Sequence, residues 1–196
     1  MDFELAKQYI IRRMERELDS TLYYHSLNHT NDVYNSATRL AEMEGVNSDD
    51  LKLLQTAACY HDSGMLITYK GHEKASTQIA AEVLPEYNYS IEEIEIVNKM
   101  IMATKLPQNA DSHLEKIICD ADLDYLGRDD FFMIAHRLKL EWKERGSDNT
   151  LREWYEGQIQ FLENHRYFTE SAKSLRLKKK KQNLKEIREL FSNHSA

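Results

Sequence analysis

The segment SDDLKLLQTAACYHDSG, residues 48–64, sets the pattern on which the whole chain is built. Its apolar residues recur at intervals of three and four, which predicts one buried face of an α-helix from Ser48: Leu51, Leu54, Ala57 and Ala58. The periodicity stops near His61, and a ten-residue loop, SGMLITYKGH, follows at residues 63–72. The segment therefore places the pair His61-Asp62 where an apolar helix meets a loop.

Helical signals continue along the rest of the chain. Three Ser/Thr–Glu pairs fit the capping box, in which the two side chains satisfy each other's free backbone donors: Ser90/Glu93, Ser112/Glu115 and Thr150/Glu153, opening helices to about Thr104, Leu126 and His165. Further helices are expected at about 2–18, 27–44, 72–84 and 129–145. Thr169 is the expected cap of a last helix, whose Lys178–Lys181 run is a solvated face. We predict an all-α fold: a single domain of about eight helices over residues 1–170, and a basic C-terminal helix or tail over residues 171–196.

Composition and charge support this fold and exclude several functions. The 196 residues include only 6 Gly and 2 Pro, and 26 Lys+Arg against 33 Asp+Glu give a net charge of −7. Residues 171–196 hold eight basic and two acidic groups, so the preceding 170 residues carry a balance of −13. An acidic body disfavours long nucleic acid as a partner and is compatible with divalent cations. The absence of a membrane span or signal-peptide pattern and the presence of only two cysteines predict a cytoplasmic protein.

Three polar segments carry the candidate chemistry. His25 and His29 are four residues apart, which puts them on one face of a helix. The pair His61-Asp62 follows an apolar helix, and the segment DADLD holds three aspartates, at 120, 122 and 124, between apolar flanks. Each segment alone also fits a structural role: a helix N-terminal histidine pair, a chance His-Asp dipeptide, or a solvated acidic face.

The order of these residues resembles the HD superfamily of metal-dependent phosphohydrolases. A His, then a His-Asp pair, then an Asp in an Ala-Asp-Leu context correspond here to His29, His61, Asp62 and Asp122. The segments YHSLNHTNDV, HDSGM and DADLDYLG carry the likeness over about residues 20–130, and the last is similar to the version in a bacterial subgroup of predicted phosphohydrolases. The resemblance implies an all-α domain with these four residues as metal ligands.

The residue types agree with this ligand set on chemical grounds. Two imidazoles and two carboxylates suit one divalent ion such as Mn, Fe, Co, Ni or Zn, and suit Mg less well. Such an ion lowers the pKa of its bound water and polarises a phosphoryl group, so that the water can attack near neutral pH. Asp62 is the residue expected to combine two roles, as a ligand and as the group that orients the attacking water.

Two further histidines extend the resemblance. His25 precedes His29 as the leaving-group acid does in cyclic-nucleotide phosphodiesterases. Because Ser26 replaces the Asn of that motif, a role in supporting the ligands or in the core is the alternative for His25. His72 falls where binuclear members have a ligand for a second ion. Their later histidines are replaced here by Thr104 and Lys105, so one ion is favoured over two.

Charged and aromatic side chains near these motifs have two open interpretations. Glu73 could orient a water, and Lys74, Lys105 and Arg128 could contact a phosphate, or all four could be ordinary surface charges. The aromatic residues after the last motif fit a core or a homodimer interface better than a base-stacking platform: Phe131, Phe132, Trp142, Trp154, Tyr155 and Phe161.

These observations predict a metal-dependent phosphohydrolase that cleaves a nucleotide or another small phosphate ester. One alternative is a cyclic-nucleotide-type phosphodiesterase of the same superfamily. A second is a non-catalytic HD-fold module that binds a nucleotide or a partner. A third is a helical interaction protein whose basic tail docks on an acidic partner or a membrane surface.

Overall fold

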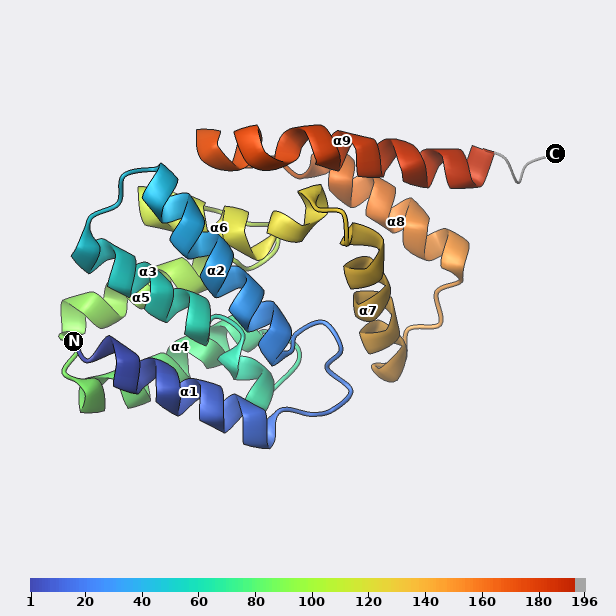
Figure 1. Cartoon of the computed structure of the whole chain (residues 1–196). Helices are drawn as coiled ribbons and strands as arrows, with labels where there is room; N and C mark the ends of the chain where they lie inside the picture. The colour runs from blue at the N-terminus through green and yellow to red at the C-terminus, as the bar shows by residue number, and fades with distance from the viewer. Residues whose placement is uncertain (193–196) are drawn as a thin grey trace.

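The computed structural model describes residues 1–192, and every regular element in this part of the chain is helical (Figure 1). The all-α prediction is therefore confirmed. The α-helices are α1 (Phe3–Glu17), α2 (Leu27–Met43), α3 (Ser48–Tyr60), α4 (His72–Val83), α5 (Ile91–Ala103), α6 (His113–Asp122), α7 (Phe131–Glu144), α8 (Leu151–Asn164) and α9 (Glu170–Ser192). Three short 3₁₀ turns lie between them: η1 (Ser63–Leu66), η2 (Leu84–Tyr87) and η3 (Asp124–Gly127).

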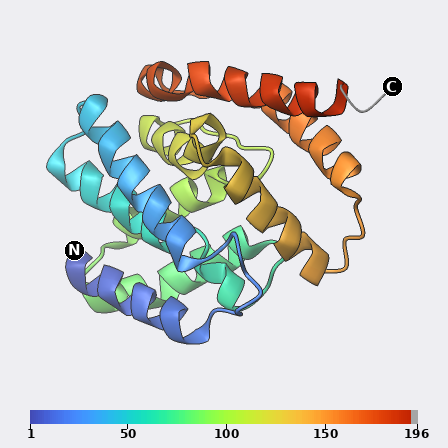
Figure 2. The same cartoon turned by 45° about the vertical axis from the view of Figure 1, so that its right-hand side comes forward.

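The helices pack around two apolar clusters. Helices α1–α6 gather on one side of the molecule, α7 and α8 lie on the other, and α9 runs along the top (Figures 1 and 2). The larger cluster lies between helices α1–α6 and includes the fully buried Ile10, Leu54 and Ile117. The smaller one, with Phe131 and Ile187, lies under α7–α9. Each buried side chain of this size contributes about 1.5–3 kcal/mol, so both clusters stabilise the arrangement.

Capping residues fix where several helices begin. The predicted capping boxes at Ser90/Glu93 and Thr150/Glu153 are both present in full. Helix α3 begins at Ser48, as predicted, and Asn47 caps it, because its side-chain oxygen accepts from the backbone N–H groups of Asp49 and Asp50. Asn is among the residues preferred at this position, since its side chain satisfies N–H groups that the helix leaves free.

Helix α6 ends earlier than predicted, at Asp122, and η3 follows it. The difference arises where α9 crosses this segment. A Cβ on Gly127 would lie 2.5 Å from the Cβ and backbone oxygen of Arg176, so glycine is what allows the two backbones to approach. Arg176 then donates to both carboxylate oxygens of Asp124, at 2.6 and 2.9 Å.

Helix α9 packs on η3 and α8. Thr169 caps it as predicted, because its hydroxyl accepts from the backbone N–H of Ala172 at 3.2 Å. The prediction that the Lys178–Lys181 run is solvated is wrong at Lys180, which is only 5% exposed. Four consecutive residues on a helix point to all sides, so one of them falls on the face that also carries the buried Asn183 and Ile187. Whether residues 171–196 act as a unit separate from residues 1–170 stays a prediction.

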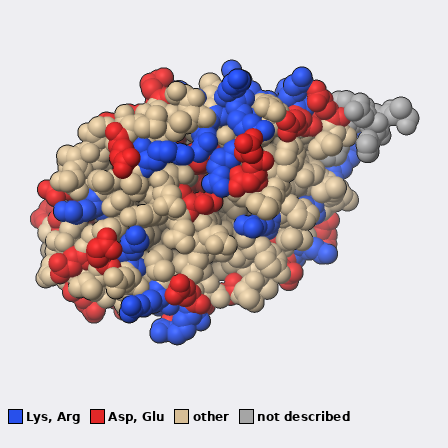
Figure 3. All heavy atoms as spheres, viewed as in Figure 1, with Lys and Arg blue, Asp and Glu red and all other residues tan. Residues whose placement is uncertain are grey.

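The outer surface of α9 carries most of the basic side chains visible along the top of the molecule, with acidic groups among them (Figure 3). In the described residues, none of the helices combines the length and the apolar character that crossing a bilayer requires.

Candidate metal centre

Three of the predicted ligands come together from three different helices. His29 lies in the first turn of α2, His61 directly follows α3, and Asp122 is the last residue of α6. The His29 Nε2 atom is 3.1 Å from Asp122 Oδ1 and 3.4 Å from His61 Nε2. The junction of the two apolar clusters brings them together, because Ala121 belongs to the larger cluster and Leu123 to the smaller.

Asp62, the fourth predicted ligand, joins this group through one oxygen. Its Oδ2 atom is 3.2 Å from His61 Nε2 and 3.5 Å from His29 Nε2. The residue is 3% exposed, and Oδ2 is buried without a hydrogen-bond partner among the described residues. An unpartnered buried carboxylate oxygen is costly, so its presence requires an explanation.

The orientation of the His61 ring supplies that explanation. Its Nδ1–H donates to the carbonyl oxygen of Ala58 at 2.8 Å, so in the neutral ring Nε2 carries a lone pair. That lone pair, the orphaned Asp62 oxygen and the Asp122 carboxylate all face one point, an arrangement that a cation stabilises.

The electrostatics agree with the geometry. Burial opposes the charged form of His61, but the Asp62 carboxylate outweighs it and raises the pKa of His61 to about 9. Burial also opposes the charged form of Asp62, yet its histidine neighbours lower the pKa of this carboxyl well below its usual range. The donor set therefore attracts positive charge and fits a divalent ion.

The turn after the His-Asp pair brings α4 against the centre. Gly64 leaves room for it, since a Cβ there would lie 1.9 Å from the backbone oxygen of His72. Ser76 of α4 fastens the contact: its hydroxyl donates to the His61 carbonyl oxygen at 2.6 Å and accepts from the Gly64 N–H at 2.8 Å. This packing brings His72 Nε2 to 3.3 Å from Asp62 Oδ1.

His25, Asp62 and His72 form a second group whose ligand atoms lie within 4.8 Å of one another. The two groups are adjacent, because Asp62 lies between them: its Oδ2 atom is next to His61 of the first group, and its Oδ1 atom is next to His72 of the second. These three residues could hold a cation, and the sequence prediction of a single ion stays a prediction.

Glu141, which sequence reasoning missed, supports His25. This residue of α7 is fully buried, and its Oε1 atom accepts from His25 Nδ1–H and, at 2.9 Å, from the Tyr69 hydroxyl. Its other oxygen accepts from the backbone N–H groups of Tyr24 and His25. Burial raises the pKa of Glu141, but these bonds and the charge of His25 outweigh it, so the pKa is lowered. The signal that could have found Glu141 is its place on the buried stripe of α7, three residues after Leu138.

The flanking aspartates of the DADLD segment are structural. Asp120 accepts from the backbone N–H groups of Phe168 and Thr169, each at 2.8 Å, while Asp124 pairs with Arg176. The interpretation of this cluster as a solvated face is therefore wrong for both, because they are buried against the start and the first turns of α9. Residues two apart point to opposite sides of a helix, which is why Asp122 alone faces the histidines.

The predicted phosphate contacts are placed unequally. Glu73 lines a pocket beside the centre, and its Oε1 is 3.8 Å from His72 Nε2. Lys74 and Lys105 are exposed, and Lys105 lies between two residues of the pocket wall. Arg128 lies outside this pocket, in ion pairs with Asp130 and Asp32.

The pocket next to the centre has a volume of about 310 Å³, which is in the range of small-molecule sites. It is lined by His25, Asp62, His72 and Asp122 and, on α7 and α8, by Trp142, Trp154, Gln158 and Phe161. A core or a homodimer interface is the prediction for all six aromatic residues of this region: Trp154 is buried and Phe161 packs against the smaller cluster, and both, with Trp142, also line the pocket. Helical periodicity cannot distinguish a pocket wall from a core, since both lie on an inward face.

The HD domain family model matches residues 26–124, just over half of the chain and all four predicted ligands. The chain belongs to the HD domain family. This membership confirms the resemblance seen in the sequence and places the chain in a superfamily of metal-dependent phosphohydrolases.

Two similar proteins were found. An uncharacterized protein of Clostridium beijerinckii is 34% identical over 99 residues, a match that covers 48% of this chain and 61% of that relative's length. The crystal structure of Bacillus subtilis YpgQ in complex with ADP superposes with a TM-score of 0.70, covering 100% of this chain and 98% of that one. At 18% identity, the latter likeness shows a shared fold.

Proposed function

We propose that this HD-domain chain is a metal-dependent phosphohydrolase that cleaves a nucleotide or a similar small phosphate ester. The observation that supports it most is the orphaned Asp62 Oδ2 atom, which faces the Nε2 atoms of His29 and His61 beside a pocket of ligand size. Buried lone pairs that converge in this way favour a cation, and the adjoining pocket can admit its substrate.

His29, His61, Asp62 and Asp122 would hold one divalent ion: Mn, Fe, Co, Ni or Zn suits the mixed nitrogen and oxygen donors, and Mg²⁺ is possible. When bound, such an ion supplies Lewis acidity, which acidifies water and draws charge from a phosphoryl oxygen. Asp62 Oδ1 faces the pocket side of the centre, 3.3 Å from His72, and is the group to orient the attacking water. Glu73, in the pocket wall, is a further acceptor for a proton of that water.

His25 is the proposed acid for the leaving group. Its Nδ1–H donates to the buried Glu141, which fixes the tautomer and the ring orientation. Its Nε2 atom is then the one available to give a proton to a departing oxygen. Lys74 and Lys105 are proposed to meet the outer phosphates at the rim. Arg128 is given no part in this, because it lies outside the pocket and its charge is balanced by Asp32 and Asp130.

A nucleotide is the proposed substrate class for two reasons. The pocket is lined both by ligating groups and by aromatic side chains. The YpgQ structure of the same fold was solved in complex with ADP, which is consistent with a nucleotide site in this fold.

A cyclic-nucleotide-type phosphodiesterase is the second candidate, and the His25–Glu141 pair is the observation that favours it. A poor leaving group such as an alkoxide needs protonation more than a phosphate leaving group does. Replacing His25 should therefore lower hydrolysis of a cyclic diester more strongly than hydrolysis of a nucleoside triphosphate, if both are substrates.

The test is metal-dependent hydrolysis. Protein stripped with a chelator is reloaded with Mn, Co, Ni or Mg and assayed against nucleoside mono-, di-, tri- and cyclic phosphates, with metal content measured in parallel. We expect turnover only with metal, and selectivity for one phosphate class. Full-rate hydrolysis in chelator, or no hydrolysis of any phosphate ester by a fully loaded protein, would contradict the proposal and in the second case favour a non-catalytic binding module.

A further inference from the structure

His25 and His72 lie side by side although they come from distant parts of the chain. Their ring centroids are 5.3 Å apart, and both residues line the pocket beside the metal centre. His25 lies just before α2 and His72 is the first residue of α4, so the helices alone do not fix how the rings are turned. Either ring nitrogen can carry the proton, and a fixed orientation therefore requires a partner that holds one of the two.

One residue, Tyr69, lies on the Nδ1 side of both rings. Its backbone carbonyl oxygen accepts from His72 Nδ1–H at 3.1 Å. Its hydroxyl donates at 2.9 Å to Glu141 Oε1, the same atom that accepts from His25 Nδ1–H. The Tyr69 ring also contacts His25 edge-to-face, with centroids 5.8 Å apart. A carbonyl and a carboxylate only accept, so both imidazoles carry a proton on Nδ1 and keep Nε2 available.

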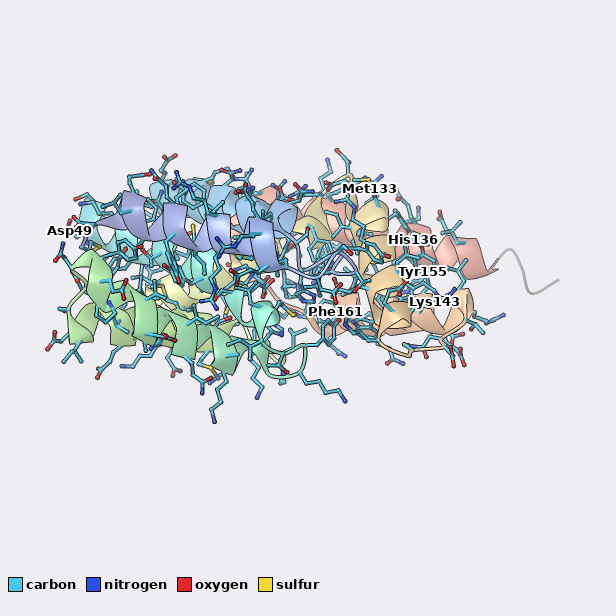
Figure 4. All side chains as sticks on the ribbon, turned by 90° about the horizontal axis from the view of Figure 1, so that it is seen from below. Asp49, Met133, His136, Lys143, Tyr155 and Phe161 are labelled. Carbon is cyan, nitrogen blue, oxygen red and sulfur yellow. The ribbon has the colours of Figure 1, made fainter. Side chains whose placement is uncertain are left out.

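Tyr69 is itself held in place, and its hydroxyl keeps its proton. The guanidinium of Arg145 lies over the Tyr69 ring at 5.1 Å and donates to the Thr21 hydroxyl at 2.8 Å. Partial burial and the Glu141 carboxylate raise the pKa of Tyr69, so the phenol remains a donor near neutral pH. These contacts cross the junction between α7–α8 and the other helices, at which Phe161 lies and which side chains from both sides fill (Figure 4).

We propose that Tyr69 is a positioning residue for both histidines: its carbonyl oxygen orients His72, and its hydroxyl orients His25 through Glu141. Two backbone N–H groups hold Oε2 of the Glu141 carboxylate, and the His25 ring and the Tyr69 hydroxyl hold Oε1. Without the hydroxyl, Oε1 keeps only the His25 ring, and the two can turn together. The assignment rests on the proposed function for one point, the role of His25 as the leaving-group acid.

Nuclear magnetic resonance of the histidine rings tests the proposal without relying on turnover. The intact chain is labelled with ¹⁵N-histidine and studied with Zn²⁺, which is diamagnetic. The spectra report which ring nitrogen carries the proton and how fast that proton exchanges with water, and we expect Nδ1–H on both His25 and His72. Tyr69→Phe removes the hydroxyl but keeps the ring and the backbone carbonyl. Exchange at His25 should therefore become about tenfold faster, the loss of one hydrogen bond to a buried carboxylate, while exchange at His72 should not change.

Tyr34→Phe is the matched control, because Tyr34 is also half-buried and its ring stacks on Phe3 of α1. It should change the exchange rate at neither histidine. Wild-type protein in which either ring carries its only proton on Nε2 would overturn the proposal, as would unchanged exchange at His25 in Tyr69→Phe.

Turnover distinguishes positioning from a general effect on the fold. With Mn²⁺, we expect Tyr69→Phe to lower kcat for phenyl phosphate about tenfold with KM unchanged. It should have little effect on 4-nitrophenyl phosphate, whose leaving group needs no proton. The same substitution should cost nothing further in His25→Ala, since the hydroxyl acts through that ring. Equal losses for both esters, or a further loss in His25→Ala, would show a merely structural role and overturn the proposal.

The two measurements also separate this proposal from the proposed function. Faster exchange at His25 in Tyr69→Phe, without hydrolysis of any phosphate ester by wild-type protein, would leave the positioning role standing and overturn the enzymatic function. Metal-dependent hydrolysis with exchange and kcat unaffected by Tyr69→Phe would do the reverse.

Discussion

The metal centre and the junction of α8 with α9 each hold a histidine with buried ring nitrogens, and the two surroundings shift its pKa in opposite directions. At the centre, carboxylates outweigh burial and raise the pKa of His61 to about 9. At the junction, burial lowers the pKa of His165 to about 3, and the cations of Lys180 and Arg166 add to this effect. Burial also lowers the pKa of Lys180, to about 8, although its Nζ donates to the His165 carbonyl oxygen at 2.6 Å.

The difference shows what distinguishes a cation site from a merely buried polar group. Both regions contain orphaned atoms: Asp62 Oδ2 in the first, and both ring nitrogens of His165 in the second. Only in the first do carboxylates converge on the imidazoles, so only there is positive charge stabilised. An unpaired buried atom is thus evidence for a ligand only together with the charge of its neighbours.

The largest effect is expected on removing the Asp62 carboxylate, which the two histidine groups of the metal centre share. Asp62→Ala deletes the residue that contacts both histidine groups, so we expect hydrolysis to fall by at least about a thousandfold and metal content to fall with it. Circular dichroism should show the same helix content, because the carboxylate satisfies no backbone donor. Activity assays and metal analysis on the same preparation measure both effects.

The junction provides the control for this variant. His165→Phe removes a buried imidazole of comparable size and should keep full metal content and activity. If Asp62→Ala retained metal and turnover, or if His165→Phe lost them, the assignment of the centre would be wrong.

Metal removal should lower the stability of proteins with an intact metal centre and leave a variant without that centre unchanged. An ion that binds only the folded state at about 100 times its dissociation constant adds about 2.7 kcal/mol to the free energy of unfolding. We expect chelation to remove this increment in wild-type protein and in His165→Phe, and to leave Asp62→Ala unchanged. Thermal melts with and without Mn²⁺ measure it. A melting temperature that is the same with and without metal in wild-type protein would count against a bound ion.

Asp120 and Asp122, both in α6, allow a structural carboxylate and a predicted metal ligand to be compared within one helix. Asp120→Asn loses a charged acceptor for the N–H groups that begin α9, so we expect the free energy of unfolding to fall by about 2 kcal/mol with metal content intact. Asp122→Asn should show the opposite: little change in the chelated protein and weaker metal binding. Urea unfolding and metal titration separate the two, and similar results for both would show that the segment is not divided in this way.

The same contrast explains which features the sequence could predict. Helix positions and the groups at His29, His61, Asp62 and Asp122 follow from local periodicity and motif order, and the family membership bears out that resemblance. Glu141 reaches His25 across 116 residues, and nothing local marks it except its place on an apolar stripe. The burial of Lys180 depends likewise on how α9 packs against the end of α8, where its Nζ donates to the His165 carbonyl oxygen. Contacts of this kind are set by tertiary packing, which a pattern along the chain does not encode.

The smallest expected effect concerns the pH dependence of the junction. The pKa of His165 is about 3 in the folded chain, below the ordinary value of 6.5. Between these two pH values the unfolded chain therefore binds a proton at His165 that the folded chain does not. Stability therefore falls as the pH drops below about 6.5, and this loss is fully developed near pH 3. With allowance for partial exposure of the ring, it amounts to about 1 kcal/mol at pH 5. Urea unfolding from pH 7 to pH 4 should show a shallower decline in His165→Phe than in wild-type protein. A decline of equal slope in both would mean that the folded junction accommodates a protonated ring, and the contrast with the metal centre would then rest on the carboxylates alone.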